Sequence, residues 1–157
     1  MALRSVICRL ALLLAALTVF SAPLFAHDIP SDVTVQGFFK PEGKTLTLLL
    51  RLPLKAVMDI EFPRKERDFV DLARADQSLR DAAKLALANN LQIYEGETLL
   101  PEPKIISARM SLDGDRSFAD YEQALAHANG PALAPETNIF WEQGLLDVAF
   151  EYPIQSD

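Results

Sequence analysis

Alternating apolar and polar positions predict two neighbouring strands near the start of the folded region. In segment 33–39 every second residue belongs to one set, Val33, Val35, Gly37 and Phe39, a spacing typical of a half-buried strand. Segment 40–44 contains a proline and a glycine, which favour a turn. Segment 45–52 then places leucines on one face, at positions 46, 48, 50 and 52. We therefore expect two antiparallel strands joined by a hairpin loop over residues 40–44.

The middle of the chain combines a helical pattern with a second hairpin pattern. Residues 76–90 carry leucines and alanines at helical spacing, and Asp76 is placed to cap the helix. Segments 91–94 and 98–100 flank Glu95-Gly96-Glu97, which predicts a hairpin. Residues 104–112 predict a further strand. Segment 53–75 has no regular pattern and receives no assignment.

The last third of the chain predicts a second helix and a third hairpin. Ser117 and Asp120 form a variant capping box for a helix that runs to about residue 128, with Gly130 as its stop. Segments 138–141 and 145–152 flank Glu142-Gln143-Gly144, a hairpin pattern. The second of these segments places four apolar residues on one face, Leu146, Val148, Phe150 and Tyr152.

The order of these elements indicates the fold class. Three hairpins and two helices that do not alternate strictly with single strands argue against a parallel nucleotide-binding sheet. We expect an α+β domain made mostly of antiparallel, sandwich-like β-sheet with two short helices.

The first 26 residues have the three parts of a cleavable signal peptide. Two arginines precede an apolar run over residues 10–20, and Pro23 and Ala26 supply the helix breaker and the small residue at the cleavage point. The apolar run is too short to span a bilayer comfortably, so an uncleaved anchor is the weaker alternative. Cys8 precedes this run, a position that does not fit a lipoprotein. We expect residues 1–26 to be the signal and residues 27–157 an exported, extracytoplasmic domain.

Charge and cysteine content restrict what the exported domain can bind. Removal of Arg4 and Arg9 from a chain of formal net charge −7 leaves −9. Nucleic acid is therefore not an expected partner, because phosphate binding needs clustered lysine and arginine. The single cysteine of the sequence, Cys8, leaves with the signal. The domain then has no disulfide and no thiolate metal site, and no cofactor is expected.

Signatures of catalysis are weak in this sequence. It lacks a nucleophile elbow, a glycine-rich nucleotide loop, a Walker loop and a zinc-protease helix motif. A serine–histidine–acid triad would have to use His27 or His127, and His127 is placed to interact with a helix dipole. The acid pairs Asp59 with Glu61 and Asp113 with Asp115 are the remaining candidates, for a glycosidase. Residues 113–124 lack the glycine and glutamate of a calcium loop.

His27 is the candidate metal ligand. Cleavage after Ala26 makes it the new N-terminus, where its α-amino group and its ring nitrogen can chelate one copper or nickel ion. A tight site needs a third donor, from Asp28 or from His127. The alternative is that cleavage simply falls before a histidine at a frayed terminus.

Several segments resemble the N-terminal exported region of HupE/UreJ-type membrane proteins. They are Ala26-His27-Asp28-Ile29-Pro30, Asp32–Gln36, Asp71–Asp76, Asp115–Ala119 with Tyr121 and Glu122, Gln143–Val148 and Phe150–Ile154. The resemblance implies a signal peptide and an extracytoplasmic domain followed by membrane helices that move nickel or cobalt. The family's metal motif lies in those helices, which this sequence lacks, so the resemblance assigns no metal-binding residue here.

Three functions follow for comparison. The first is a non-enzymatic domain on the periplasmic side of the bacterial inner membrane, with a membrane-embedded permease portion as partner. Under this hypothesis, one interpretation is that the domain is truncated at its C-terminus. The second is a free periplasmic protein that binds a transition-metal ion through His27. The third is a small hydrolase that uses paired acids.

Overall fold

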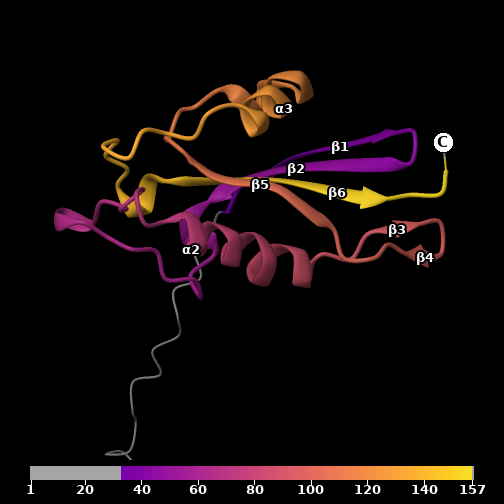
Figure 1. Cartoon of the computed structure of the whole chain (residues 1–157), viewed down its shortest axis with the longest axis horizontal. Coiled ribbons are helices and arrows are strands. Elements are labelled where there is room, and N and C mark those ends of the chain that lie inside the picture. The colour runs from indigo at the N-terminus through magenta and orange to yellow at the C-terminus, as the bar shows by residue number, and fades with distance from the viewer. Residues whose placement is uncertain (1–32, 157) are drawn as a thin grey trace, which may run out of the picture.

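The chain folds around an antiparallel sheet of four strands (Figure 1). The structure is a computed structural model that describes residues 33–156. The strands are β1 (Gln36–Glu42), β2 (Thr45–Pro53), β5 (Lys104–Ser111) and β6 (Leu145–Pro153). Their order in the sheet is β1-β2-β6-β5. A separate two-stranded sheet pairs β3 (Tyr94–Glu95) with β4 (Thr98–Leu99). The fold class is therefore α+β with mostly antiparallel sheet, as the sequence predicts.

The first hairpin is tighter than expected. β1 and β2 are antiparallel neighbours, and their register continues to the pair Glu42↔Thr45. Only Gly43 and Lys44 remain for the turn, and Gly43 has a φ of 56°. Two-residue hairpins need positive φ to match the twist of their strands, which glycine adopts at no steric cost. The predicted loop over 40–44 is therefore wrong in length, while the predicted pairing is confirmed.

β6 lies in the middle of the sheet, far from its neighbours in sequence. It pairs with β2 along its whole length, from Leu145 to Pro153, and with β5 on its other side. The predicted third hairpin is wrong, because Phe140 forms only an isolated bridge with Phe69 and Trp141–Gln143 is a 3-10 turn (η6). Insertion between β2 and β5 buries both faces of β6, and this burial outweighs the local turn pattern.

The first helical segment has the predicted extent, but its N-terminal cap is a different residue. It comprises α2 (Asp76–Asp81), a π-helical stretch η3 (Ala82–Leu87) and a 3-10 turn η4 (Ala88–Asn90). Asp76 is not the cap. Ala75, fully buried, occupies that position, and its methyl side chain makes no capping bond. Asp76 instead pairs with the exposed Arg80.

The second helix begins three residues later than predicted. Ser117–Ala119 is a 3-10 turn (η5), and α3 spans Tyr121–Asn129. Asp120 is the cap, and its carboxylate accepts a 2.8 Å hydrogen bond from the Gln123 backbone N–H. Ser117 does not cap, because its hydroxyl binds an arginine of the sheet. The predicted C-terminal stop at Gly130 is confirmed.

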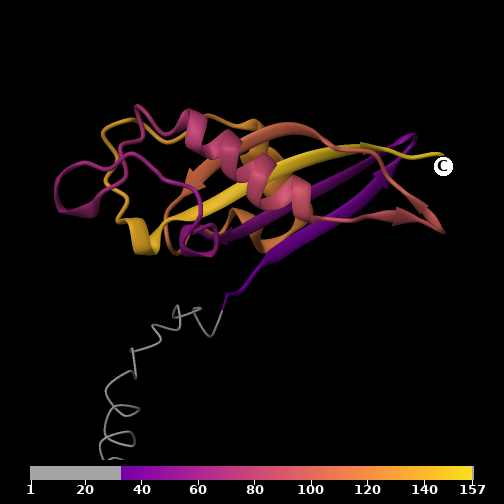
Figure 2. The ribbon, with the colours of Figure 1, turned by 90° about the horizontal axis from the view of Figure 1, so that it is seen from below.

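The sheet separates two apolar layers. The larger layer contains the alternating leucines of β2 and the predicted face of β6, packed under the α2 segment as Figure 2 shows. The smaller layer, under α3, contains five buried residues, Leu49, Phe118, Ala124, Ala128 and Ala149. Short 3-10 turns, η1 (Leu54–Ala56) and η2 (Glu66–Asp68), lie in the segment without a sequence assignment. No helix within residues 33–156 is long and apolar enough to cross a membrane.

Truncation of the central leucine tests this arrangement. Leu48 is 1% exposed, so Leu48→Ala should lower the free energy of unfolding by about 3 kcal/mol through lost burial and a residual cavity. Urea unfolding followed by circular dichroism measures this change. The matched control is Leu99→Ala on the 51% exposed Leu99, for which a change below about 0.5 kcal/mol is expected. Equal effects of the two variants would contradict the assignment of the core.

Candidate functional site

A buried arginine stands at the centre of the polar residues under α3. Arg51 lies on β2 directly opposite Asp147 on β6, and the two residues are 4% and 2% exposed. The guanidinium donates Nε–H and Nη2–H to the two carboxylate oxygens of Asp147, each at 2.6 Å. Such two-pronged pairing is among the strongest of charge-assisted hydrogen bonds. The pair ties the two central strands together on the α3 side of the sheet.

The loop after β5 supplies further partners to the same guanidinium. Nη1 donates to the backbone oxygen of Asp115 at 2.8 Å, and the second Nη2–H is shared between the Asp115 carboxylate at 3.0 Å and the Ser117 hydroxyl at 2.9 Å. The ring of Phe118 covers the group, with its centroid 4.3 Å from the Arg51 Cζ atom. Arg51 therefore holds η5, the turn that leads into α3, against the sheet.

The charges of this cluster stabilise one another against burial. Burial alone would lower the pKa of Arg51, but its hydrogen bonds and charge interactions with Asp147 and Asp115 outweigh this and raise the pKa. Partial burial would raise the pKa of Asp115, but hydrogen bonds from Ser117 and Arg51 lower it to about 2. Both groups are therefore charged at neutral pH.

Ser111 and His127 complete the cluster from β5 and α3. The Ser111 hydroxyl donates to Asp147 Oδ2 and accepts from Arg51. His127 Nε2 lies 3.0 Å from the Ser111 oxygen and 3.0 Å from Asp147 Oδ2. A nitrogen lone pair cannot face a carboxylate oxygen at this distance without repulsion, so Nε2 carries a hydrogen and donates it. His127 thus fastens the last turn of α3 to the sheet, beyond the dipole interaction that its position predicts.

This serine, histidine and aspartate do not form a catalytic triad. In a triad the base nitrogen of histidine accepts the serine proton, while the acid holds the other ring nitrogen. Here Ser111 and Asp147 both face Nε2. Ser111 is also 1% exposed, so its hydroxyl is closed to a substrate. The arrangement stabilises the fold rather than activating a nucleophile.

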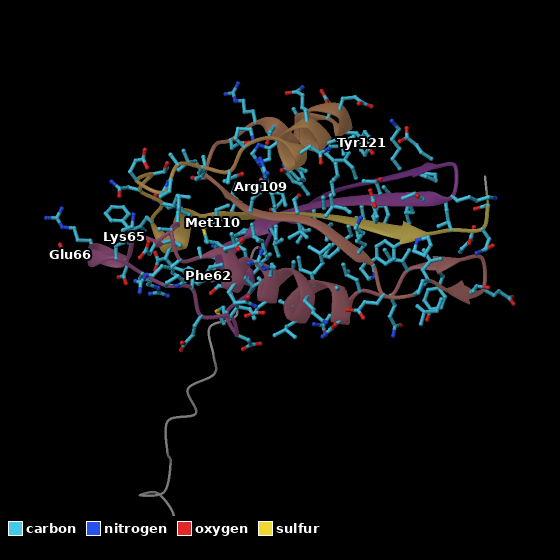
Figure 3. All side chains as sticks on the ribbon, viewed as in Figure 1. Phe62, Lys65, Glu66, Arg109, Met110 and Tyr121 are labelled. Atoms are coloured by element: carbon cyan, nitrogen blue, oxygen red, sulfur yellow. The ribbon has the colours of Figure 1, made fainter. Side chains whose placement is uncertain are left out.

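Arg109 binds the end of α3 from the neighbouring strand. It lies opposite Asp147 in the β5–β6 register and on the same side of the sheet as Tyr121 of α3 (Figure 3). Its guanidinium donates to the backbone oxygens of His127, Gly130 and Pro131, which satisfies carbonyls that a helix end leaves unpaired. Burial lowers the pKa of Arg109, and the charge of Asp147 opposes that shift. The row of Arg51, Asp147 and Arg109 therefore links three strands to both ends of α3.

A polar hollow of about 250 Å³ adjoins the cluster. Its lining includes Arg51, Thr34, Gln36, Asp113 and Asp115. Asp113 and Asp115, one of the two acid pairs that the sequence offers for a glycosidase, have different surroundings here. Asp115 is paired with Arg51, while Asp113 is exposed. A glycosidase acid needs a raised pKa, whereas that of Asp115 is lowered.

The other acid pair is also open to solvent. Asp59 and Glu61 are both exposed and lie in the irregular segment between η1 and η2. Their exposure leaves them without the water-excluding surroundings of a catalytic acid.

The candidate metal ligands are not brought together in the described chain. His27 and Asp28 lie outside the described residues. His127, the possible third donor, has its Nε2 engaged with Asp147 and Ser111. Within residues 33–156 no group of three or more histidine, cysteine, aspartate or glutamate side chains is arranged to hold a metal ion.

The sequence hypotheses missed Arg51, Ser111 and Asp147. A weak signal for two of them is present, because Arg51 and Asp147 are charged residues inside otherwise apolar segments that are predicted as strands. A charge in such a segment is costly to bury unless it is paired. Pairing of the two segments would have suggested the ion pair, but residues 51 and 147 are 96 positions apart.

Loss of one charge of the Arg51–Asp147 pair should destabilise the fold far more than loss of both. Asp147→Asn leaves the buried guanidinium with the carboxylate of Asp115, which is 30% exposed, as its remaining counter-charge. This variant should lower the free energy of unfolding by about 3–5 kcal/mol. The variant that combines Arg51→Met with Asp147→Leu should cost less than the sum of its two single substitutions. Chemical denaturation of the native chain, Arg51→Met, Asp147→Leu and the combined variant gives the coupling energy. Additive effects would contradict a direct role for the pair, and Arg80→Ala on an exposed pair is the control, with little change expected.

Acid should weaken the fold through Asp115. Its pKa is about 2 in the folded chain against an ordinary 3.8, so the folded state favours the ionised form. That stabilisation is complete above pH 3.8 and is lost as the pH falls toward 2. Melting temperatures of the native chain should therefore fall more steeply over this interval than those of Asp115→Asn. Parallel curves for the two proteins would refute the assigned contact.

Comparison with known proteins identifies no relative: no family model, no curated protein and no solved structure matches the chain.

Proposed function

We propose that this chain is a non-enzymatic extracytoplasmic domain of a HupE/UreJ-type membrane protein implicated in nickel or cobalt transport. The observation that carries the proposal is where the resembling segments lie in the fold. Asp115, Ser117 and Phe118 come from one segment and Asp147 from another, and all four contact Arg51. A resemblance spread along the sequence thus coincides with one physical cluster, as expected of residues that a shared fold requires.

Other resembling residues also have structural contacts. In the segment before α2, Ala75 is fully buried and Asp71 pairs with Arg74 at 2.6 Å. Tyr121, from the segment at the start of α3, packs its ring against Phe38 of β1. Gly144 lies where an added Cβ would clash with the side chain of Leu54, so a larger residue would displace the start of β6. These contacts support a role for the segments in the fold rather than in chemistry.

The contacts of the polar residues around Arg51 support a non-enzymatic role. Arg51, Asp147 and Ser111 use their hydrogen-bonding capacity on one another and on Asp115, Ser117 and His127. A reactive group needs a free face toward its substrate, and the buried Asp147 and Ser111 offer none. The domain would then act by recognition and support on the periplasmic side of the inner membrane, next to a membrane-embedded portion or partner.

The genomic context of the coding sequence tests this proposal. DNA that continues the coding sequence, in the same frame or after one frameshift, should encode several apolar runs of about 20 residues. These runs should contain histidines and acidic residues, which are costly in lipid and mark an ion path. An unrelated gene directly after a genuine stop codon, with no membrane helices encoded nearby, would refute the permease-domain proposal.

The alternative is a free periplasmic protein that binds a metal through His27, favoured by the signal pattern that ends at Ala26. Calorimetry with copper and with nickel, on protein isolated from the periplasm with His27 as its first residue, distinguishes the two functions. Weak or absent binding is expected under the main proposal. Micromolar or tighter binding that His27→Ala abolishes would favour the metal-binding protein instead.

A further inference from the structure

β1 leaves one edge of the main sheet uncovered. Among the described strands it pairs only with β2, so its outer backbone groups have no strand beside them. An unpaired edge of this kind is a template for pairing with another strand. The segment from Gln36 to Lys40 is extended and regular.

The two edges of the sheet differ in their protection. β5, at the opposite edge, has a register irregularity between Ile105 and Ser107, a feature that discourages edge pairing. The register of β1 continues without a break. Its proline, Pro41, lies near the turn, and its lysine, Lys40, is drawn toward α3 by Glu122 at 3.1 Å. The remainder of the strand is open to a partner.

Apolar side chains on β1 and directly before it are exposed next to this edge. Phe38 points toward α3, where it packs against Phe118 and Tyr121. The alternate residues point to the other side of the sheet, and Val35 and Phe39 are 53% and 60% exposed there. The α2 segment packs against β5, and the exposure of Val35 and Phe39 shows that this strip is uncovered.

We propose that β1 pairs with β1 of a second copy of this chain, antiparallel and centred on Gly37. A two-fold axis at Gly37 places Val35 of each copy opposite Phe39 of the other. The two four-stranded sheets then become one continuous sheet. Interfaces of this self-complementary kind are the commonest among homo-oligomers.

The sequence of β1 fits its own copy in this register. Val35 opposite Phe39 is a β-branched–aromatic pair, a favourable combination across antiparallel strands. On the other face Gln36 lies opposite Phe38, and Thr34 lies opposite Lys40. No two like charges oppose each other along these pairs, although the chain as a whole is acidic. A second copy therefore suits this edge, because it brings the matching apolar residues and places Lys40 opposite an uncharged threonine.

Charge substitutions at the paired positions test the proposal. Val35→Lys and Phe39→Glu each place a charge opposite an apolar residue, and each should weaken dimerisation of the full chain by about tenfold or more. The variant that combines both substitutions places a positive charge opposite a negative one at two points of the interface, and it should restore the dimer. Sedimentation equilibrium over a range of protein concentrations measures the dissociation constants.

Three further results complete the test. Leu99→Lys, at a similarly exposed residue on β4, is the matched control and should leave dimerisation unchanged. Circular dichroism establishes that each variant is folded, as the exposure of both substituted positions predicts. A native chain that stays monomeric at millimolar concentration would overturn the proposal and leave the edge to a different strand. A dimer that persists in both single variants would overturn it equally.

Discussion

The buried ion pair between Arg51 and Asp147 is the constraint on which the rest of this structure depends. Two charges removed from water are tolerated only when each has a partner of good geometry. β2 and β6 can meet on the α3 side only in the register that places these residues opposite each other. A shift by one residue would carry the alternating leucines of β2, at positions 46, 48, 50 and 52, to the wrong face and would separate the charges. Apolar burial and charge pairing therefore select the same register.

Several elements far apart in sequence take their positions from that pair. η5 lies against the sheet because Asp115 and Ser117 bind the guanidinium and Phe118 covers it. The last turn of α3 is held because His127 reaches Asp147 and Arg109 binds the helix-end carbonyls. The fully buried side chains that α3 contributes to its layer are small, Ala124 and Ala128, while the larger Tyr121 and Leu125 pack against it partly buried. Polar contacts at both ends therefore add to apolar packing in holding α3 on the sheet.

The polar groups near Arg51 make structural contacts, which bears on the function of the chain. Groups that would be candidates for chemistry, such as Ser111 and His127, are engaged in holding α3 on the sheet. Within residues 33–156 the β1 edge exposes backbone and apolar surface, which suits recognition of a protein strand. A domain that contributes an interaction surface to a larger assembly is consistent with the proposed place beside a membrane-embedded portion. The segments that resemble HupE/UreJ-type proteins would then preserve the ion-pair cluster that keeps this surface in place.

The sequence by itself determined the local elements. Alternation in 45–52 and 145–152 identified β2 and β6 and their buried faces, and the helical spacing of 76–90 identified the first helical segment, because a residue's face depends only on its own segment. The tertiary structure alone decided that β6 lies between β2 and β5 rather than in a local hairpin, and that Asp120 rather than Ser117 caps α3. It also decided that Arg51, Ser111, His127 and Asp147 meet. The physical reason is that the cost of burying a charge depends on which distant residue faces it, and only the folded chain specifies that partner.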